Sequence, residues 1–115
     1  MDVTIKSKRR LFLKTKLASA YRQIVILNPD DVDAHVRLGD VCYELGKYED
    51  AIAAYKKVIV LNPNDSLGHY NLAKVYLKIG NRDMAEKEYQ ILKTPDGKLE
   101  KELCDLIQQN QVKKG

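Results

Sequence analysis

One phrase recurs along the chain at a distance of 34 residues. The stretch AYRQIVILNPDD fills residues 20–31, and AYKKVIVLNPND fills residues 54–65. The same shift aligns further columns, namely Leu38 with Leu72, Gly46 with Gly80, Ala51 with Ala85, and Tyr21 with both Tyr55 and Tyr89. A fixed period of this length is the signature of a chain that stacks one small structural unit on the next. The repeat therefore restricts the fold to a linear stack.

The period divides the 115 residues into about two and a half units. We expect a single domain, because a chain of this length buries one elongated core but not two. Its expected segments are a basic N-terminal helix that forms half a repeat at residues 1–31, a full repeat at 32–65, a shortened full repeat at 66–94, and a turn, capping helix and short tail at 95–115.

Each full unit is expected to form two helices. In the first half of the complete unit, apolar residues recur at the helical period, in steps of four, three and four: Ala34, Leu38, Val41 and Leu45. A second stripe begins at Ala51 and stops at Asn62, because Pro63 lacks an amide hydrogen and keeps its predecessor away from helical angles. Asp65 or Ser66 then caps the next helix. The following pair is expected at residues 66–79 and 82–93.

The two ends of the chain are each expected to add one helix. Residues from about 7 to 27 form one continuous helix, because the partner that its repeat needs would have ended near residue 11, where the chain is too short for one. After the turn sequence TPDG, residues 98–110 form an amphipathic helix. The last unit of a repeat array otherwise exposes its stacking surface, so this helix is interpreted as a cover and not as a site.

The N-terminal helix has no partner helix from its own repeat. Its apolar side chains are then incompletely covered, among them Leu13, Leu17 and Ile24. An uncovered apolar face marks an association surface. Self-association through this helix, as a twofold homodimer or by exchange of the helix between chains, is the predicted remedy. The alternatives are a monomer and a fragment of a longer repeat array.

The repeat resembles the tetratricopeptide repeat family, whose 34-residue unit has a Leu-Gly pair, a later alanine, an aromatic residue four positions on and a proline near its end. The complete unit matches at Leu38, Gly39, Ala51, Tyr55 and Pro63, and the following unit matches at Leu72, Ala73, Ala85 and Tyr89. The resemblance covers about residues 14–93. It implies an all-α fold, a right-handed superhelical stack of antiparallel helix hairpins with a C-terminal capping helix.

The sequence departs from the family pattern at a few positions. His35 and His69 stand where the family often has tryptophan, and Cys42 stands where it often has an aromatic residue. Pro95 arrives two residues too soon for a standard exit, so the third hairpin is expected to end early.

Composition excludes several classes of protein. With 44% hydrophobic and 31% charged residues, the chain is an ordinary soluble domain. It has no apolar run near the roughly 18 to 20 residues of a membrane span and no apolar signal stretch, so a cytoplasmic location is expected. The sequence also lacks a glycine-rich phosphate loop, paired metal-ligand spacing and a nucleophile with a positioned base. We therefore expect no enzymatic activity, no cofactor and no metal.

The histidines and cysteines are interpreted as structural. Equivalent helices in such a stack lie roughly 8 to 10 Å apart, whereas zinc needs both imidazoles within about 2.1 Å of one ion. His35 and His69, 34 residues apart, therefore favour a packing or rim role over a zinc site. Cys42 lies on or beside the buried stripe, which favours a core thiol. Neither Cys42 nor Cys104 has a close-spaced partner, so both are expected to be reduced.

The resemblance also implies a binding surface. In this family the first helix of each pair lines a concave face, which holds an extended or helical peptide segment of another protein. Carried onto this chain, the face comprises Asp33, Val36, Arg37, Asp40, Tyr43, Glu44, Leu67, Tyr70, Asn71, Lys74, Leu77 and Lys78. Its tyrosines and leucines offer apolar contact area between a mostly acidic helix and a basic one. The alternative is a solvated polar face.

Some family members clamp the C-terminal carboxylate of chaperones with lysines and asparagines. In this sequence Asn71, Lys74 and Lys78 are the residues that suggest such a clamp. Three carboxylates on the facing helix, those of Asp33, Asp40 and Glu44, would repel a terminal carboxylate from across the groove. The general peptide groove is therefore favoured over the clamp.

The net charge of +4 is unevenly distributed. Residues 1–29 have a net charge of +6, with Asp2 as the one acidic residue, and residues 30–115 have a net charge of −2. The alternative function is association with nucleic acid or an anionic membrane through Lys6, Lys8, Arg9, Arg10, Lys14 and Lys16. Ile5, Leu11 and Phe12 would then dip into the membrane surface. Against it, a basic face on a terminal helix is usually just solvated.

Overall fold

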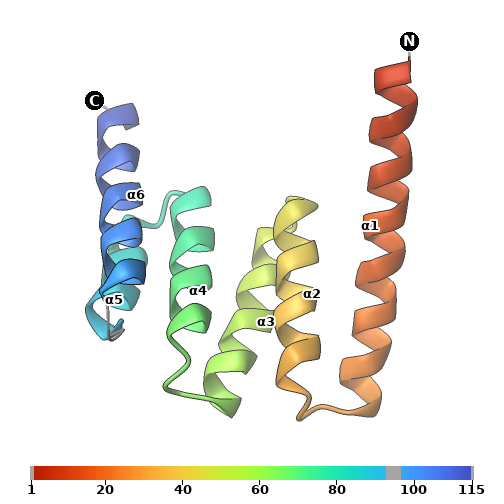
Figure 1. Ribbon diagram of the computed structural model, residues 1–115, viewed down its shortest axis with the longest axis horizontal. Coiled ribbons are helices and arrows are strands. Elements are labelled where there is room, and N and C mark those ends of the chain that lie inside the picture. The colour runs from red at the N-terminus through yellow and green to blue at the C-terminus, as the bar shows by residue number, and fades with distance from the viewer. Residues whose placement is uncertain (1, 93–96, 115) are drawn as a thin grey trace.

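The computed structural model describes residues 2–92 and 97–114 of the chain (Figure 1). These residues form helices without any strand: α1 Asp2–Leu27, α2 Val32–Glu44, α3 Tyr48–Leu61, α4 Ser66–Lys78, α5 Arg82–Ile91 and α6 Lys98–Lys114. The all-α prediction is confirmed. Figure 1 shows the helices standing side by side, with α1 at one end of the row and α5 and α6 at the other.

Aspartate caps begin the first helix of each full repeat. The backbone amide of Ala34 donates to Asp31 Oδ1 over 3.1 Å, and the amide of Gly68 donates to Asp65 Oδ1 over 3.0 Å. Each bond satisfies an amide that has no partner within its own helix. Of the two caps that the sequence offers for α4, Asp65 and Ser66, Asp65 is the one that forms.

Glycines make the tight turns between the paired helices. Gly46 follows α2 with a φ of 78°, and Gly80 follows α4 with a φ of 80°. This left-handed region is strained for residues that carry a Cβ atom, which is why glycine recurs there at the 34-residue period.

The helices pack as consecutive hairpins. α2 pairs with α3 and α4 pairs with α5, while α3 packs on α4 and joins the two hairpins. α1 packs on α2, and α6 packs on both α4 and α5. The fully buried side chains at the centre of the stack are Cys42, Ala51, Val58, Ala73, Val75, Ala85 and Leu103. Cys42 is therefore a core thiol, as predicted.

The helix ends differ from the sequence expectation by a few residues. α1 is one continuous helix, but it begins at Asp2 and not near residue 7. α6 runs to Lys114, beyond the predicted residue 110. α5 has 10 residues where α3 has 14, so the third hairpin does end early. Pro95, to which that early end was attributed, lies outside the described residues, as does most of the TPDG turn.

Exposed apolar side chains remain on α1. Leu13, Leu17 and Ile24 are 60%, 46% and 38% exposed, whereas Ala18 on the side that faces α2 is 1% exposed. The side chain of Ile5 lies outside the part of the chain that is described. No helix in the described residues is long and apolar enough to span a bilayer.

Candidate partner-binding groove

Two adjoining hollows lie on the face formed by α2, α4 and α6. The first, of about 150 Å³, is lined by Tyr43, Lys74, Leu77, Lys78, Leu106, Gln109 and Asn110. The second, of about 340 Å³, is lined by Asp40, Tyr43, Glu44, Tyr55, Asn71 and Lys74. Tyr43 and Lys74 belong to both linings, so we treat the two hollows as one groove. We call it the groove below.

Lys74 lies between two tyrosine rings at the centre of the groove. Its Nζ is 5.5 Å from the ring centroid of Tyr43 and 5.5 Å from that of Tyr70. Tyr43 in turn packs edge-on against Tyr48, with 5.7 Å between ring centroids. A cation above an aromatic face is attracted by the ring quadrupole, so these contacts hold the ammonium group in place. The groove thus has a positioned cation flanked by aromatic surface.

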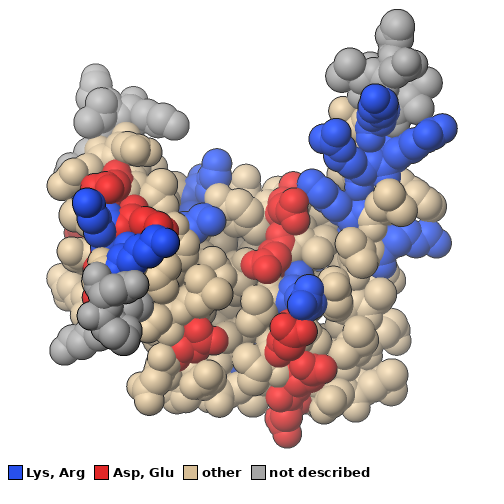
Figure 2. Space-filling model, viewed as in Figure 1, with Lys and Arg blue, Asp and Glu red and all other residues tan. Residues whose placement is uncertain are grey.

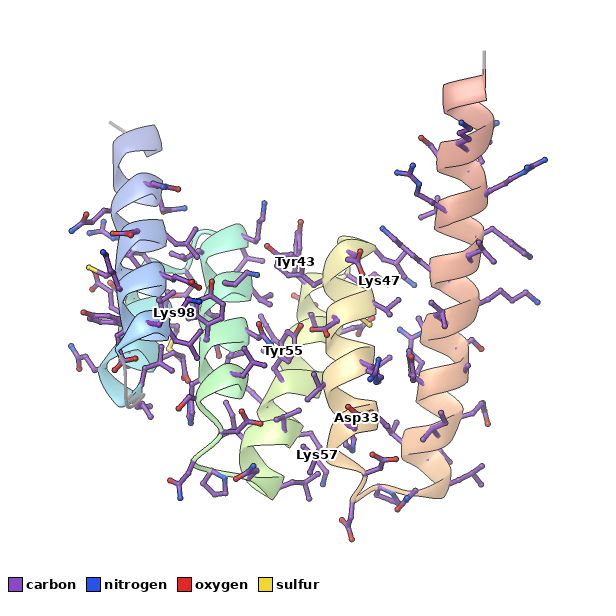
Figure 3. The ribbon with its side chains drawn as sticks, in the orientation of Figure 1. Asp33, Tyr43, Lys47, Tyr55, Lys57 and Lys98 are labelled. Atoms are coloured by element: carbon purple, nitrogen blue, oxygen red, sulfur yellow. The ribbon has the colours of Figure 1, made fainter. Side chains whose placement is uncertain are left out.

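Tyr55 forms the inner wall where α3 meets α2 (Figure 3). Its hydroxyl donates a hydrogen bond to the carboxylate of Asp40. Burial, followed by the bond to Asp40, raises the pKa of Tyr55 well above its usual value. Burial also raises the pKa of Tyr70, with Glu102 of α6 as the next cause. Both phenols therefore stay neutral donors at physiological pH.

The charges on the two sides of the groove have opposite signs. Asp40 and Glu44 belong to α2, whereas Lys74 and Lys78 belong to α4. Figure 2 shows acidic side chains gathered over α2 and basic ones at the upper end of α4. Glu44 also pairs with Lys14 of α1 over 3.2 Å, at the surface. The groove is therefore polarised across its width.

Seven of the twelve predicted groove residues line it: Asp40, Tyr43, Glu44, Asn71, Lys74, Leu77 and Lys78. Tyr70 contributes through its contact with Lys74. Asp33 and Arg37 pair with each other over 2.8 Å at the surface, and Val36 and Leu67 belong to neither lining. Leu77 is 9% exposed and lies at the floor, so it offers less contact area than the sequence suggested.

Sequence reasoning missed the contribution of α6. Leu106, Gln109 and Asn110 line the groove, and the Asn110 side-chain amide donates to the Leu77 carbonyl over 3.5 Å. The sequence did contain an indication of this contribution. α4 begins at residue 66 and α6 begins at residue 98, which is 32 residues later and close to the repeat period. Under that shift the three residues occupy the positions of Lys74, Leu77 and Lys78. α6 thus stands where the first helix of another repeat would stand.

The histidines are bonded to the backbone of the preceding turn. His35 Nε2 lies 2.8 Å from the Pro29 carbonyl oxygen, and His69 Nε2 lies 3.0 Å from that of Pro63. His69 Nδ1 also lies 2.6 Å from Glu88 Oε1, in a buried pair. Within the described residues no three metal-ligating side chains come together. Both histidines therefore join a helix to the turn before it.

Two family models match the chain. One, described as Tetratricopeptide repeat, matches residues 20–53, and the other, described as TPR repeat, matches residues 39–80. Together they cover residues 20–80, more than half of the chain. A comparison with curated protein sequences gave no match.

Several solved structures share the fold. The MamA crystal structure matches at 26% identity with a TM-score of 0.66, covering 79% of this chain and 53% of that one, so this chain spans about half its length. The type III secretion translocator chaperone SycD of Yersinia enterocolitica matches at 17% identity with a TM-score of 0.76, covering 94% and 79%. PcrH in complex with the chaperone binding region of PopD matches at 18% identity with a TM-score of 0.71, covering 96% and 95%. By its repeat sequence, its stacked hairpins and both family matches, the chain belongs to the tetratricopeptide repeat family.

Proposed function

We propose that the chain is a non-enzymatic protein-interaction module, or adaptor, that holds a peptide segment of a partner protein in the groove. The observation that carries the proposal is the position of Lys74 between Tyr43 and Tyr70, on a face lined by three helices. Tyrosines in well-packed pockets are among the residues that most often dominate binding energy at protein interfaces. The likeness to PcrH, which is in complex with a region of PopD, supports a peptide as the kind of ligand.

The polarity of the groove specifies the charge pattern of that peptide. Acidic residues of the peptide would lie near Lys74 and Lys78, and basic residues near Asp40 and Glu44. Opposed charges of this kind fix the direction in which a ligand binds and exclude ligands of reversed pattern. An apolar side chain between them would enter the hollow above Leu77 and Leu106.

Site-specific photo-crosslinking in the cell of origin tests the groove. A benzoylphenylalanine residue in place of Lys78 should crosslink to a partner protein, and the same residue in place of Glu44 should capture the same partner. The control replaces Val60 of α3, which is 70% exposed and belongs to neither lining of the groove. Equal capture from Val60, or capture from Val60 alone, would rule out the groove as the binding site.

A charge reversal in the groove then measures its contribution to affinity. For the captured partner segment, made as a peptide, Lys74→Glu should weaken binding by roughly tenfold or more. The matched control is Lys56→Glu on α3, where the lysine is exposed and lines neither hollow. The two variants have the same charge, so a difference between them reports position and not net charge.

Self-association through α1 is a second proposed property. It is supported by the exposure of Leu13, Leu17 and Ile24, on a helix that packs on α2 in the part of the chain that is described. The apolar face of α1 does not line the groove, so both properties can operate in one molecule.

A further inference from the structure

The exposed apolar residues of α1 form a regular stripe. Steps of four, three, four and three residues connect its members, which are Leu13, Leu17, Ala20, Ile24 and Leu27. Four of them are large side chains with exposures of 60%, 46%, 38% and 82% in chain order. This alternating spacing keeps one face of a helix against a second helix over several turns. We call these five residues the α1 stripe.

The α1 stripe lies away from the side of α1 that packs on the domain. Ala18 is 1% exposed on the inner side, and Lys14, Tyr21, Arg22 and Val25 are half-buried there. The stripe residues sit roughly a third of a turn from that set at 100° per residue. From Leu13 to Leu27 the stripe is roughly 21 Å long at 1.5 Å per residue. It is thus long enough to accept one partner helix.

Opposite charges lie at the two ends of the stripe. On the N-terminal side of Leu13 the helix continues as a basic arm with Lys6, Arg9 and Arg10. This arm projects past the end of α2 (Figures 1 and 2). Beyond Leu27 the chain turns at Asp30 and Asp31. Asp30 is exposed and Asp31 caps α2. A partner helix must therefore be acidic at the end that lies near the basic arm and basic at the end that lies near Asp30.

We propose that the α1 stripe binds the α1 stripe of a second copy of this chain, with the two helices antiparallel and crossing near Ala20. This inference rests on the self-association proposed above and assigns its geometry. The antiparallel arrangement brings the basic arm of each copy to the acidic turn of the other. Ala20 is small, so the helices can approach to about 8 Å at the crossing. A twofold axis there makes both halves of the contact identical.

Other arrangements fit the stripe less well. A parallel pair would place the two basic arms side by side, with like charges opposed over more than one turn. An anionic membrane would attract the arm, but it would repel Asp30 at the other end of the same stripe. The second copy in antiparallel order is the occupant that matches both ends.

Sedimentation velocity over a hundredfold range of concentration tests the dimer. The mass should rise from 13.2 kDa towards twice that value. Leu17→Glu should keep it at 13.2 kDa at every concentration. The control is Ile26→Glu, since Ile26 is 67% exposed on the same helix but off the stripe, and it should dimerise like the parent chain. A parent chain that stays monomeric throughout, or equal loss in both variants, would overturn the proposal.

A charge exchange tests the contact between the arm and the turn. Arg10→Glu should weaken the dimer by roughly fivefold or more, and adding Asp30→Arg to the same chain should restore it. Both residues are exposed, so neither change disturbs the core. If the double variant dimerises more weakly than Arg10→Glu alone, the two groups are not opposed and the antiparallel arrangement is wrong.

Chemical crosslinking fixes the direction of the helices. Leu13→Cys and Leu27→Cys are made separately in a Cys104→Ser background, because Cys104 is half-buried while Cys42 is fully buried. A short bismaleimide should join the two variants when they are mixed and should join neither variant to itself. Crosslinks within each single variant would indicate a parallel pair and would reject the proposal.

Two further measurements separate this inference from its rivals. A parent chain that is monomeric and co-sediments with phosphatidylserine vesicles, through binding that Arg10→Glu abolishes, would assign the arm to membranes and overturn the dimer. Leu17→Glu should leave photo-capture from Lys78 unchanged, because the stripe does not line the groove. The proposed dimer and the proposed groove function can therefore be refuted independently of each other.

Discussion

Tyr55 is almost fully buried, yet its hydroxyl donates a hydrogen bond to the carboxylate of Asp40 at the edge of the groove. The ring can lie so deep because Gly39 of α2 has no side chain at the point where the ring passes. One aromatic residue of α3 thus links the packing of its hairpin to the surface that α2 presents.

Tyr55→Phe should remove this bond with little change in packing. We expect the free energy of unfolding to fall by about 1 to 2 kcal/mol, because the acceptor is charged but remains exposed to water. Urea unfolding followed by circular dichroism measures the change. Tyr89→Phe is the matched control in the next unit, where the hydroxyl lies beside the thiol of Cys104, a weak acceptor. An equal loss in both variants would mean that the bond to Asp40 stabilises the fold no more than the contact of the Tyr89 hydroxyl with Cys104 does.

Gly39→Ala should destabilise the domain, although alanine favours helices by about 1 kcal/mol. A methyl group at Gly39 would lie 2.6 Å from Cε1 of Tyr55, closer than unbonded carbon atoms approach. We expect a net loss of about 1 to 3 kcal/mol, the usual cost of overpacking. Thermal unfolding measures it.

A double-mutant cycle identifies the cause of that loss. In a Tyr55→Leu background, Gly39→Ala should cost less than in the parent chain, because the ring that it meets is gone. Ala73 already carries a methyl group at the equivalent position of the next unit, where Tyr89 is only half-buried. If the cost of Gly39→Ala is the same in both backgrounds, the ring contact is not its origin.

The sequence predicted the fold well because one period determines most of it. Asp31 and Asp65 cap equivalent helices, and Gly46 and Gly80 make equivalent turns, so each element is supported by a second copy. The extra length of α1 could not be predicted in this way, since residues 1–6 do not match in sequence the residues 34 positions later, 35–40. Its start at Asp2 depends on a segment without a repeat.

The candidate site was less predictable, because it depends on contacts between units. The family resemblance placed Tyr43 and Lys74 on one face, and the two do lie close together, but the burial of Leu77 follows from the packing of α6 on α4. α6 is offset by 32 residues from α4 and not by 34, which hides its equivalence. Glu88 was missed for a related reason: its counterpart 34 residues earlier is Ala54, so the repeat pattern gives no indication of a buried charge.

The buried pair of His69 and Glu88 should make stability depend on pH. Burial lowers the pKa of His69, but its hydrogen bonds to Glu88 and to the Pro63 carbonyl outweigh burial, and the pKa is raised. With both ring nitrogens facing acceptors, the folded chain binds the histidine proton more tightly than the unfolded chain does. The stabilisation is therefore fully present below the unfolded value of about 6.5, and it is lost as the pH rises through the folded value.

Urea unfolding midpoints of the parent chain should accordingly fall as the pH rises above about 6.5. Glu88→Gln keeps an oxygen that can accept from the ring but removes the negative charge, so it should flatten this dependence. His69→Gln removes the titrating group, so it should also flatten the dependence on pH. It should lower the free energy of unfolding at the acidic end of the pH range. A parent chain whose midpoint rises over the same interval would contradict a raised pKa of His69 in the folded chain. An unchanged slope in Glu88→Gln would show instead that another group titrates there.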